Sequence, residues 1–231
     1  MNGRISSFQT LGTLDGPGVR FVAFLQGCPL RCVCCHNPET WDISGGTEFS
    51  AQEVVDRMLK YKEYFGKTGG ITLSGGEPLL QSEFSTEVFA LSKQNGINTC
   101  LDTSGYILNE KTKELLEYTD YCLLDIKYTN DADYKKYTGI SEKKPLEFLE
   151  YLNKASIPTR IRQVIITGLN DSLDSVKKLK TLKYRCVEEI ELLPFRKLCA
   201  EKYKKLNIAF ALKNMPEASQ SKIEELNGVL I

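Results

Sequence analysis

Residues 19–35 read Val-Arg-Phe-Val-Ala-Phe-Leu-Gln-Gly-Cys-Pro-Leu-Arg-Cys-Val-Cys-Cys. The first seven residues are mostly apolar and include several β-formers, so we predict a strand over residues 19–25. A glycine follows shortly after this run, and four cysteines lie in the next eight residues. In parallel α/β folds the carboxyl ends of the strands carry the functional site. This stretch therefore predicts a buried strand that leads into a chemically active loop.

The same alternation of strand and helix continues along the chain. Further strands are predicted over residues 71–73, 97–101, 121–126, 159–166 and 189–193. Helices are predicted over residues 50–64, 83–93, 110–118, 144–155, 173–182 and 219–226. Ser50 and Glu53 form a capping-box pattern, and Asn95-Gly96 is a helix stop. The alternation indicates right-handed βαβ units, about six of them, fewer than the eight of a closed barrel. We predict one α/β domain over residues 1–231 with a parallel sheet.

Composition and charge narrow the possible functions. The chain has 231 residues, of which 42% are hydrophobic, and 30 Lys and Arg balance 30 Asp and Glu. A formal net charge of zero gives no support for a nucleic-acid or membrane-surface partner. The first residues lack the apolar core of a signal peptide, and no apolar run is long enough to span a bilayer. We expect a soluble cytoplasmic protein with no nucleic-acid or membrane partner.

The cysteines fall into two groups. Four are scattered singly, and we expect them to be small buried residues, as free cysteines often are: Cys100, Cys122, Cys186 and Cys199. The others are clustered, with Cys28, Cys32 and Cys35 in a CxxxCxxC pattern. Three thiolates on a four-iron cluster leave one iron free to bind a substrate. A structural zinc site with His36 or Cys34 as fourth ligand, or a purely structural loop, remain alternatives.

Polar and glycine-rich segments follow several predicted strands. They are Ser74-Gly75-Gly76-Glu77, Asp102-Thr103-Ser104-Gly105, Asp125-Ile126-Lys127, Gly168 and Leu193-Pro194. The glycines permit close approach of a ligand to the backbone, although a plain turn has the same pattern. The carboxylates need a partner when buried, which an ion pair, a helix cap or a cation can supply. We expect these segments to meet at one edge of the sheet.

Several of these motifs together resemble a known family. They include Asp15-Gly16-Pro17-Gly18-Val19-Arg20, the cysteine pattern followed by His36-Asn37-Pro38, Gly75-Gly76-Glu77-Pro78, Leu101-Asp102-Thr103-Ser104-Gly105, Leu124-Asp125-Ile126-Lys127 and Glu191-Leu192-Leu193-Pro194-Phe195. In this order the motifs resemble the glycyl-radical-enzyme activating enzymes of the radical S-adenosylmethionine (SAM) superfamily, and among them the activators of pyruvate formate-lyase. The resemblance spans nearly the whole chain. It implies a partial (β/α)6 barrel of parallel strands, of radical SAM type.

The resemblance also implies a reaction. Cys28, Cys32 and Cys35 would hold a [4Fe-4S] cluster, and SAM would bind its open iron. One electron from the cluster would cleave SAM to methionine and a 5′-deoxyadenosyl radical. That radical would take a hydrogen atom from a glycine of a glycyl radical enzyme, with pyruvate formate-lyase as the first expectation. A flavodoxin- or ferredoxin-like protein would supply the electron.

The same resemblance assigns further residues. The SAM site would include Cys34, Cys35, His36, Asn37, Gly75, Gly76, Glu77, Asp102, Asp125, Ile126, Lys127 and Arg196. A monovalent cation, Na⁺ or K⁺, would bind Asp102, Thr103, Asp125 and the carbonyl of Leu123. His36, Arg162 and Asp15 would face the substrate.

Two positions depart from the family pattern, and alternative functions remain. Cys34 stands where radical SAM proteins usually carry an aromatic residue, and Arg196 stands where the activators carry a histidine. Many activators of other glycyl radical enzymes carry an inserted ferredoxin-like module, and the absence of cysteine from residue 36 to 74 favours the short type. An activator of a different glycyl radical enzyme, a small-molecule radical SAM enzyme and a zinc-stabilised binding module are the other hypotheses.

Overall fold

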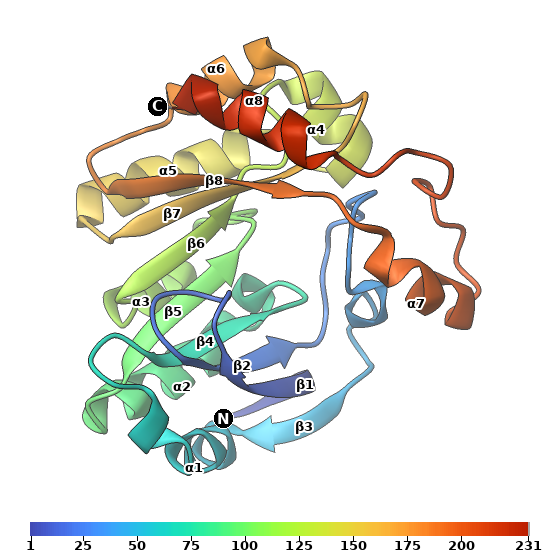
Figure 1. Ribbon diagram of the computed structural model, residues 1–231. Helices are drawn as coiled ribbons and strands as arrows, with labels where there is room; N and C mark the ends of the chain where they lie inside the picture. The colour runs from blue at the N-terminus through green and yellow to red at the C-terminus, as the bar shows by residue number, and fades with distance from the viewer. Residues whose placement is uncertain (231) are drawn as a thin grey trace. The chain divides into compact units, whose positions relative to one another are not determined.

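The computed structural model describes residues 1–230, and they divide into two compact units (Figure 1). The first unit comprises Met1–Pro29 and Thr40–Leu123. The second comprises Leu30–Glu39 and the chain from Leu124 onward. The hydrogen-bonded strand order is β3-β1-β2-β4-β5-β6-β7-β8. The prediction of a single domain stays a prediction.

The first unit carries most of the strands. Its elements are β1 (Asn2–Gly12), β2 (Arg20–Leu25), β3 (Thr47–Ser50), α1 (Ala51–Leu59), β4 (Gly70–Gly75), α2 (Ser82–Gln94), β5 (Asn98–Thr103) and α3 (Glu110–Glu117), with short 3-10 turns at Lys62–Tyr64 and Pro78–Gln81. β6 (Tyr121–Asp125) begins in this unit and ends in the second, and a 3-10 turn at Pro38–Thr40 also crosses the division. β2 pairs in parallel with β4, and β4 with β5, whereas β1 runs antiparallel to β2 and β3.

The second unit is built on the last strands. Its elements are α4 (Asp131–Thr138), α5 (Lys143–Ala155), β7 (Thr159–Ile165), α6 (Leu173–Lys180), β8 (Val187–Pro194), a 3-10 turn at Lys197–Cys199, α7 (Ala200–Lys205) and α8 (Gln220–Leu230). β7 and β8 are parallel, with a bulge near their start. α8 packs against α6 and β8 (Figure 1). No helix among residues 1–230 has the length and apolar character needed to cross a membrane.

The predicted α/β fold with a mostly parallel sheet is confirmed. All six predicted strands are present, as β2 and β4 to β8, and all six predicted helices are present. The Ser50 and Glu53 capping box forms, but the helix ends at Leu59 and a 3-10 turn follows, so the predicted range of 50–64 was too long. The four scattered cysteines are buried, as expected.

Four elements were not predicted. β1 has polar or half-exposed residues at most positions, so it lacks the apolar run that signals a buried strand. β3 and α7 are only four and six residues long. α4 has a weak apolar pattern, and only its ends give a signal: Asn130 accepts a hydrogen bond as the N-cap, and Gly139 takes a left-handed conformation at the other end.

Arg20 is the largest side chain fully buried in the first unit. Its Nε donates to Thr72 Oγ1 at 3.0 Å, and its Nη1 donates to Asn98 Oδ1 at 2.8 Å and to the carbonyl of Thr68 at 3.2 Å. Its Nη2 also donates to the carbonyl of Ile71. One guanidinium thus connects the beginnings of β2, β4 and β5. Burial lowers the pKa of Arg20 somewhat, but an arginine keeps its charge in proteins.

We expect Arg20→Met to destabilise the protein by about 3 kcal/mol or more, because several buried acceptors would lose a charged donor. The free energy of unfolding from urea titration measures this. Arg185→Met is the matched control, since Arg185 is exposed and its loss should cost less than ~0.5 kcal/mol. Equal stability of the two variants would mean that the Arg20 network does not hold the strands.

Candidate functional site

The strand ends of the first unit are held together by close backbone contacts. Gly76 N donates to the carbonyl of Leu25 at 2.8 Å, and Glu77 N donates to the carbonyl of Gly27 at 2.9 Å. A side chain at residue 76 has no space, because a Cβ there would lie 2.2 Å from the Gly27 carbonyl oxygen. Glycine is therefore required at residue 76 by the packing of the backbone, in addition to the ligand-binding role predicted for the Gly-Gly pair. It fixes the backbone directly before Cys28.

Glu77 is buried, and four hydrogen bonds hold its carboxylate. Thr103 Oγ1 donates to Oε1 at 2.6 Å, and Leu79 N donates to the same oxygen at 3.1 Å. The backbone N–H and the hydroxyl of Ser104 both donate to Oε2. Burial raises the pKa of Glu77 above its ordinary value, although these donors oppose the shift. Glu77 thus joins the end of β4 to the end of β5.

Asp102, Thr103 and Asp15 lie in the same unit. Asp102 accepts a hydrogen bond from the Ser74 hydroxyl at 2.7 Å, so the carboxylate is held at the edge formed by β4 and β5. Thr103 donates its hydroxyl to Glu77, as described above. The carbonyl of Asp15 accepts from Thr72 Oγ1 at 2.7 Å, which fixes the turn before β2. Leu123, whose carbonyl was predicted as a cation ligand, is fully buried in β6.

In the second unit the cysteine loop is anchored to α4 and α7. Arg31 N donates to the carbonyl of Thr138, and Val33 N donates to the carbonyl of Tyr137, each at 3.0 Å. Cys35 N donates to the carbonyl of Cys32 at 3.1 Å, which closes a turn between these two cysteines. The Tyr203 hydroxyl donates to the carbonyl of Cys35 at 3.1 Å.

The cysteines of the loop differ in exposure. Cys28 in the first unit and Cys32 and Cys35 in the second are partly exposed, and none of the three forms a disulfide. Cys34 is buried among Tyr128, Phe195 and other apolar residues. Burial raises the pKa of the Cys34 thiol to about 11, so it stays protonated at neutral pH. The exposure pattern separates the three predicted ligands from the fourth cysteine of the loop.

The donor set fits an iron–sulfur cluster. Thiolates are the usual ligands of such clusters, and the three accessible thiols have the CxxxCxxC spacing. The buried hydroxyl of Tyr128 has no hydrogen-bond partner among residues 1–230. The Tyr128 side chain belongs to the same group of packed apolar side chains as Cys32 and Cys34. A buried group of this kind is a common sign of an absent ion or water. Across the described part of the chain, no three His, Cys, Asp or Glu side chains are already grouped around one metal position.

Asp125 is the centre of an ion-pair network in the second unit. Its Oδ1 accepts from Arg162 Nε at 3.0 Å, and its Oδ2 accepts from Lys127 Nζ at 2.5 Å. Burial favours the neutral acid, but Arg162 and Lys127 outweigh it and lower the pKa of Asp125. Burial also works against the charge of Lys127, yet Asp125 raises the pKa of Lys127 well above its usual value. All three groups are therefore ionised at neutral pH.

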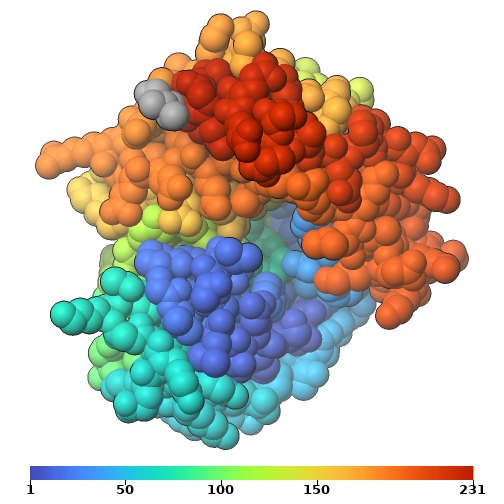
Figure 2. Space-filling view, viewed as in Figure 1, coloured from blue at the N-terminus to red at the C-terminus, as the bar shows by residue number. Residues whose placement is uncertain are grey.

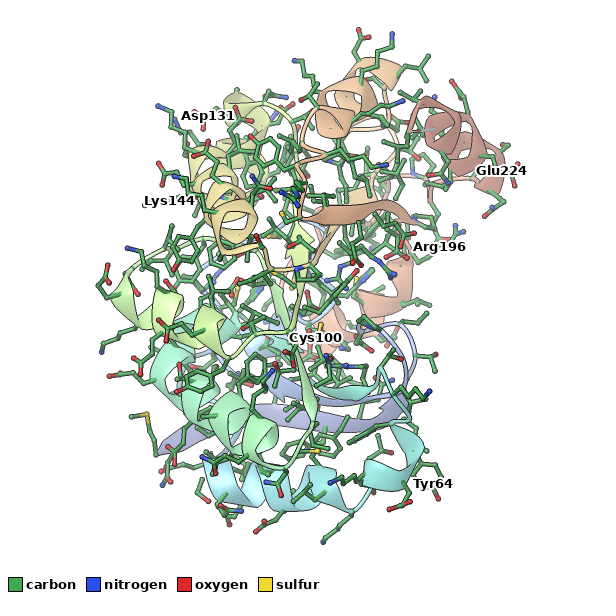
Figure 3. All side chains as sticks on the ribbon, turned by 90° about the vertical axis from the view of Figure 1, so that its left-hand side faces the viewer. Tyr64, Cys100, Asp131, Lys144, Arg196 and Glu224 are labelled. Atoms are coloured by element: carbon green, nitrogen blue, oxygen red, sulfur yellow. The ribbon has the colours of Figure 1, made fainter. Side chains whose placement is uncertain are left out.

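The His36 imidazole contacts the backbone of Arg196, not its side chain. His36 Nε2 is 2.8 Å from the carbonyl of Arg196, and the imidazole stacks on Phe195 with ring centroids 5.7 Å apart. The Arg196 guanidinium turns to the beginning of α8, where it donates to the carbonyl of Ala218 at 2.9 Å. Figure 3 labels Arg196 in this part of the second unit. Asn37 accepts a hydrogen bond from Lys202 at 2.8 Å.

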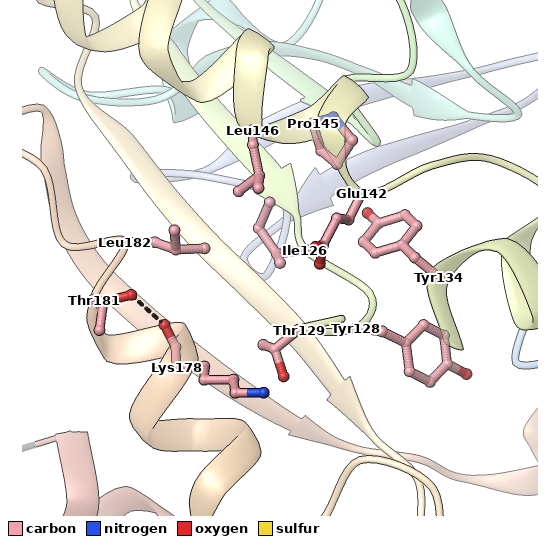
Figure 4. Close-up of a pocket in the computed structure, with 10 residues that line it drawn as sticks. All are labelled: Ile126, Tyr128, Thr129, Tyr134, Glu142, Pro145, Leu146, Lys178, Thr181 and Leu182. Carbon is pink, nitrogen blue, oxygen red and sulfur yellow. Dashed lines mark hydrogen bonds between the residues drawn. The ribbon is translucent and has the colours of Figure 1, made fainter. Parts of the chain in front are cut away.

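A cavity of about 150 Å³ lies behind the loop that follows β6 (Figure 4). It is lined by Ile126, Tyr128 and Thr129 of the loop and by residues of α4, α5 and α6. Of the predicted site residues only Ile126 contributes to it. Burial raises the pKa of Glu142 at its edge. The cavity is therefore separate from the ionic network around Asp125.

Several residues around the site were not predicted from the sequence. Tyr128, Lys202 and Tyr203 contact or flank the cysteine loop, and Ser104 holds Glu77. Of these, only Ser104 lay in a motif that the sequence singled out. Lys202 and Tyr203 are more than 160 positions away from the loop in the sequence, so no local pattern could connect them.

The class of protein follows from a comparison with known families. Residues 22–179 match the model of the Radical SAM superfamily, which is more than half of the chain. The match covers the last four residues of β2, the cysteine loop and the strand ends that carry Glu77, Asp102 and Asp125. The fold and the cysteine pattern therefore define a radical SAM protein.

Comparison with individual proteins shows to which family of radical SAM proteins the chain belongs. The chain is 42% identical to the pyruvate formate-lyase-activating enzyme of Clostridium pasteurianum, over 99% of this chain and 97% of that protein. It is 39% identical to the pyruvate formate-lyase 1-activating enzyme of Escherichia coli strain K12, over 99% of this chain and 95% of that protein. The crystal structure of a domain of such an enzyme from Bacteroides vulgatus shares the fold, with a TM-score of 0.58 and 24% identity over 70% of this chain and 92% of that one. The chain belongs to the family of pyruvate formate-lyase-activating enzymes.

The pKa of Glu77 leads to a prediction on pH. Because the folded chain raises this pKa, the folded state binds the proton more tightly than the unfolded chain does. The stability from this group is therefore gained as pH falls toward the ordinary glutamate pKa of about 4.3 and lost as pH rises. We expect the free energy of unfolding of the wild type to rise relative to that of Glu77→Gln as the pH is lowered from about 7.5 to about 5. Urea unfolding at both pH values measures it, and a constant difference would contradict the expectation.

Proposed function

We propose that this protein activates pyruvate formate-lyase by taking a hydrogen atom from one of its glycines. The observation that carries the proposal is the identity of about 40% over nearly the full length of two curated activating enzymes. The segments that the motifs occupy, including Glu77, Asp102 and Asp125, lie at strand ends. Glycine suits the reaction because its Cα carries no side chain to block approach.

We propose that Cys28, Cys32 and Cys35 hold a [4Fe-4S] cluster whose open iron binds SAM. The cluster would supply the electron that cleaves SAM reductively, and a flavodoxin- or ferredoxin-like carrier would supply that electron to the cluster. The protein itself binds and orients. Glu77 holds the β4 and β5 loops in place, and the partial exposure of the three thiols supports their role as ligands. Eight cysteines that form no disulfide fit a reducing, cytoplasmic setting.

The other predicted residues receive roles within this proposal. Gly75, Gly76 and Glu77, with Asp125, Ile126 and Lys127, would contact SAM, as would the backbone of Cys34. His36, Asn37 and Arg196 would also belong to the SAM site; the His36 ring is already held by the Arg196 carbonyl, while the Arg196 side chain is engaged at α8. Arg162 and Asp15 would face the glycine-bearing loop of the partner. The charge of Arg162 is neutralised by Asp125, so it can position this carboxylate.

A test of the activity uses electron paramagnetic resonance. Anaerobic protein reduced with dithionite is mixed with SAM and pyruvate formate-lyase, and we expect the doublet of a glycyl radical. Cys32→Ala should abolish the doublet and lower the iron content, because a cluster ligand is lost. Cys122→Ala is the matched control and should retain both, since Cys122 is a buried residue of β6. A small molecule turned over efficiently, with no radical on any glycyl radical enzyme, would instead support the small-molecule alternative.

We also propose that Asp102, Thr103, Asp125 and the Leu123 carbonyl bind a monovalent cation, Na⁺ or K⁺. Hard oxygen ligands suit such an ion. Asp125 is a poor position for a test, because its loss would leave Lys127 and Arg162 without their shared carboxylate. Asp102 accepts a hydrogen bond from the Ser74 hydroxyl, and its replacement by Asn disturbs the surrounding structure less than the loss of Asp125 would.

We therefore expect Asp102→Asn to weaken SAM binding several-fold and to remove the dependence of that binding on Na⁺ or K⁺, because one charged ligand of the cation is lost. Equilibrium binding of SAM in buffers with and without these ions measures both effects. Asp174→Asn is the control, since Asp174 is an exposed residue of α6. Normal SAM affinity with unchanged salt dependence in Asp102→Asn would mean that this carboxylate is structural.

A further inference from the structure

The segment from Arg196 to Glu217 has an unusual charge for this chain. It carries six basic residues and two acidic ones, a net charge of +4, whereas the whole chain is neutral. The basic residues are Arg196, Lys197, Lys202, Lys204, Lys205 and Lys213. A local excess of this kind attracts partners of opposite charge. The segment contains α7 and the loop that follows it.

Four of these six basic residues pair with no carboxylate within residues 1–230; Lys197, the least exposed of them, donates its Nζ to the carbonyl of Lys213 at 2.8 Å. Arg196 pairs with Glu217, and Lys202 pairs with Glu39. Lys204, Lys205 and Lys213 are exposed and form no ion pair within residues 1–230. Figure 2 shows the orange α7 segment with side chains that extend into solvent. Leu198 and Lys213 lie outside α7, in the segments before and after it; we call Leu198, Lys204, Lys205 and Lys213 together the basic face of α7.

An exposed apolar side chain lies in the same segment. Leu198 is 85% exposed, more than any other large hydrophobic residue in the part of the chain that the structure describes. Leu206, at the other end of α7, is 41% exposed. Isolated exposed leucines are common, but an exposed leucine in a segment with several lysines that form no ion pair has the composition of a small docking surface with a polar rim.

The opposite side of α7 is fixed to the cysteine loop. The Tyr203 hydroxyl donates to the carbonyl of Cys35, and Lys202 donates to Asn37 at 2.8 Å and pairs with Glu39. Tyr203 is itself buried, with its ring 4.8 Å from that of Phe210. A protein that docks on the basic face is therefore one buried side chain away from a residue that we assign as a cluster ligand.

We infer that the basic face of α7 is the docking surface for an acidic one-electron carrier protein that reduces the cluster. The inference rests on the proposed function, which requires such a carrier. One electron leaves the reduced centre of the carrier, and the cluster takes it up; no bond forms or breaks in this step. Short electron-transfer encounters use small interfaces, which matches a helix of six residues and its flanking loop. Complementary charge raises the association rate without requiring a large contact area.

The electron carrier is favoured over the glycyl radical enzyme as the occupant. A carrier has to approach the cluster ligands, and α7 contacts Cys35 directly. The glycyl radical enzyme has to deliver a glycine to SAM, and none of the residues that we assign to SAM is among the four of the basic face. Docking of the glycyl radical enzyme on the same face is an outcome that the test separates.

The test compares two double variants with the same change of charge. Lys204→Glu with Lys205→Glu reverses the basic face, and Lys143→Glu with Lys144→Glu reverses an exposed pair on α5, where Figure 3 labels Lys144. Leu198→Ser changes the apolar residue alone. Each anaerobic, cluster-loaded protein is mixed in a stopped-flow instrument with flavodoxin hydroquinone or with dithionite, and the loss of visible cluster absorbance gives the reduction rate.

We expect the α7 double variant to be reduced by flavodoxin at least about tenfold more slowly at low salt, with a weaker dependence of the rate on salt. Its reduction by dithionite should stay within about twofold of the wild type, because this small reductant needs no docking surface. The α5 double variant should behave like the wild type with both reductants. Leu198→Ser should raise the flavodoxin concentration that gives half of the maximal rate.

Other outcomes would overturn the inference. Equal slowing of both double variants would show an effect of net charge rather than of a surface. Normal reduction of the α7 double variant by flavodoxin would also reject the inference. A lower yield of glycyl radical when this variant is reduced with dithionite would instead assign the basic face of α7 to the glycyl radical enzyme. Failure of dithionite-reduced wild type to form the glycyl radical would count against the proposed function instead.

Discussion

The Arg20 guanidinium is the interaction on which the first unit depends. It is fully buried, and it donates hydrogen bonds to groups near the beginnings of β4 and β5 from the first residue of β2. Parallel strands have no tight turn to set their register, so an interior anchor of this kind adds to what the pattern of buried side chains specifies. With the beginnings aligned, β2, β4 and β5 end at comparable positions. The segments with Cys28, Glu77 and Thr103 then emerge at the same edge of the sheet.

Close contacts between backbone segments also hold the carboxyl ends of β2 and β4 together, in addition to the Arg20 network at their beginnings. The close approach of Gly76 to Gly27 excludes a side chain, and Glu77 connects the β4 loop to Thr103 and Ser104. In the second unit, charge replaces close packing: Asp125 holds Lys127 from its own loop and Arg162 from β7. The two units thus position their polar groups by different means. Removing a donor around Glu77 leaves a buried acceptor with one hydrogen bond fewer, whereas removing Asp125 takes away the carboxylate that Lys127 and Arg162 share.

The sequence predicted the strands well where burial was strong. The six predicted strands have runs of apolar residues, and these runs are sufficient to find them. β1 was missed because its residues are largely polar or half-exposed, and α7 because six residues give no helical period. For the site, spacing identified the cysteines and position after strands identified Glu77, Asp102 and Asp125. The resemblance to a family supplied their roles. The contacts of Tyr203 and Lys202 with the cysteine loop could not be predicted, since they join residues far apart in the sequence.

The burial of Cys34 has a consequence for how the protein withstands oxygen. Thiolates, not thiols, attack disulfides and react with peroxide, and accessibility limits both reactions. Cys34 is protonated at neutral pH and enclosed by aromatic and aliphatic side chains, so it is a poor partner for its three neighbours in disulfide formation. If air destroys a cluster on this loop, we expect oxidation at the partly exposed thiols of Cys28, Cys32 and Cys35 rather than at Cys34. A reductant that restores those thiols then returns the complete ligand set, without a mispaired bridge to the fourth cysteine, and the loop is ready for reassembly.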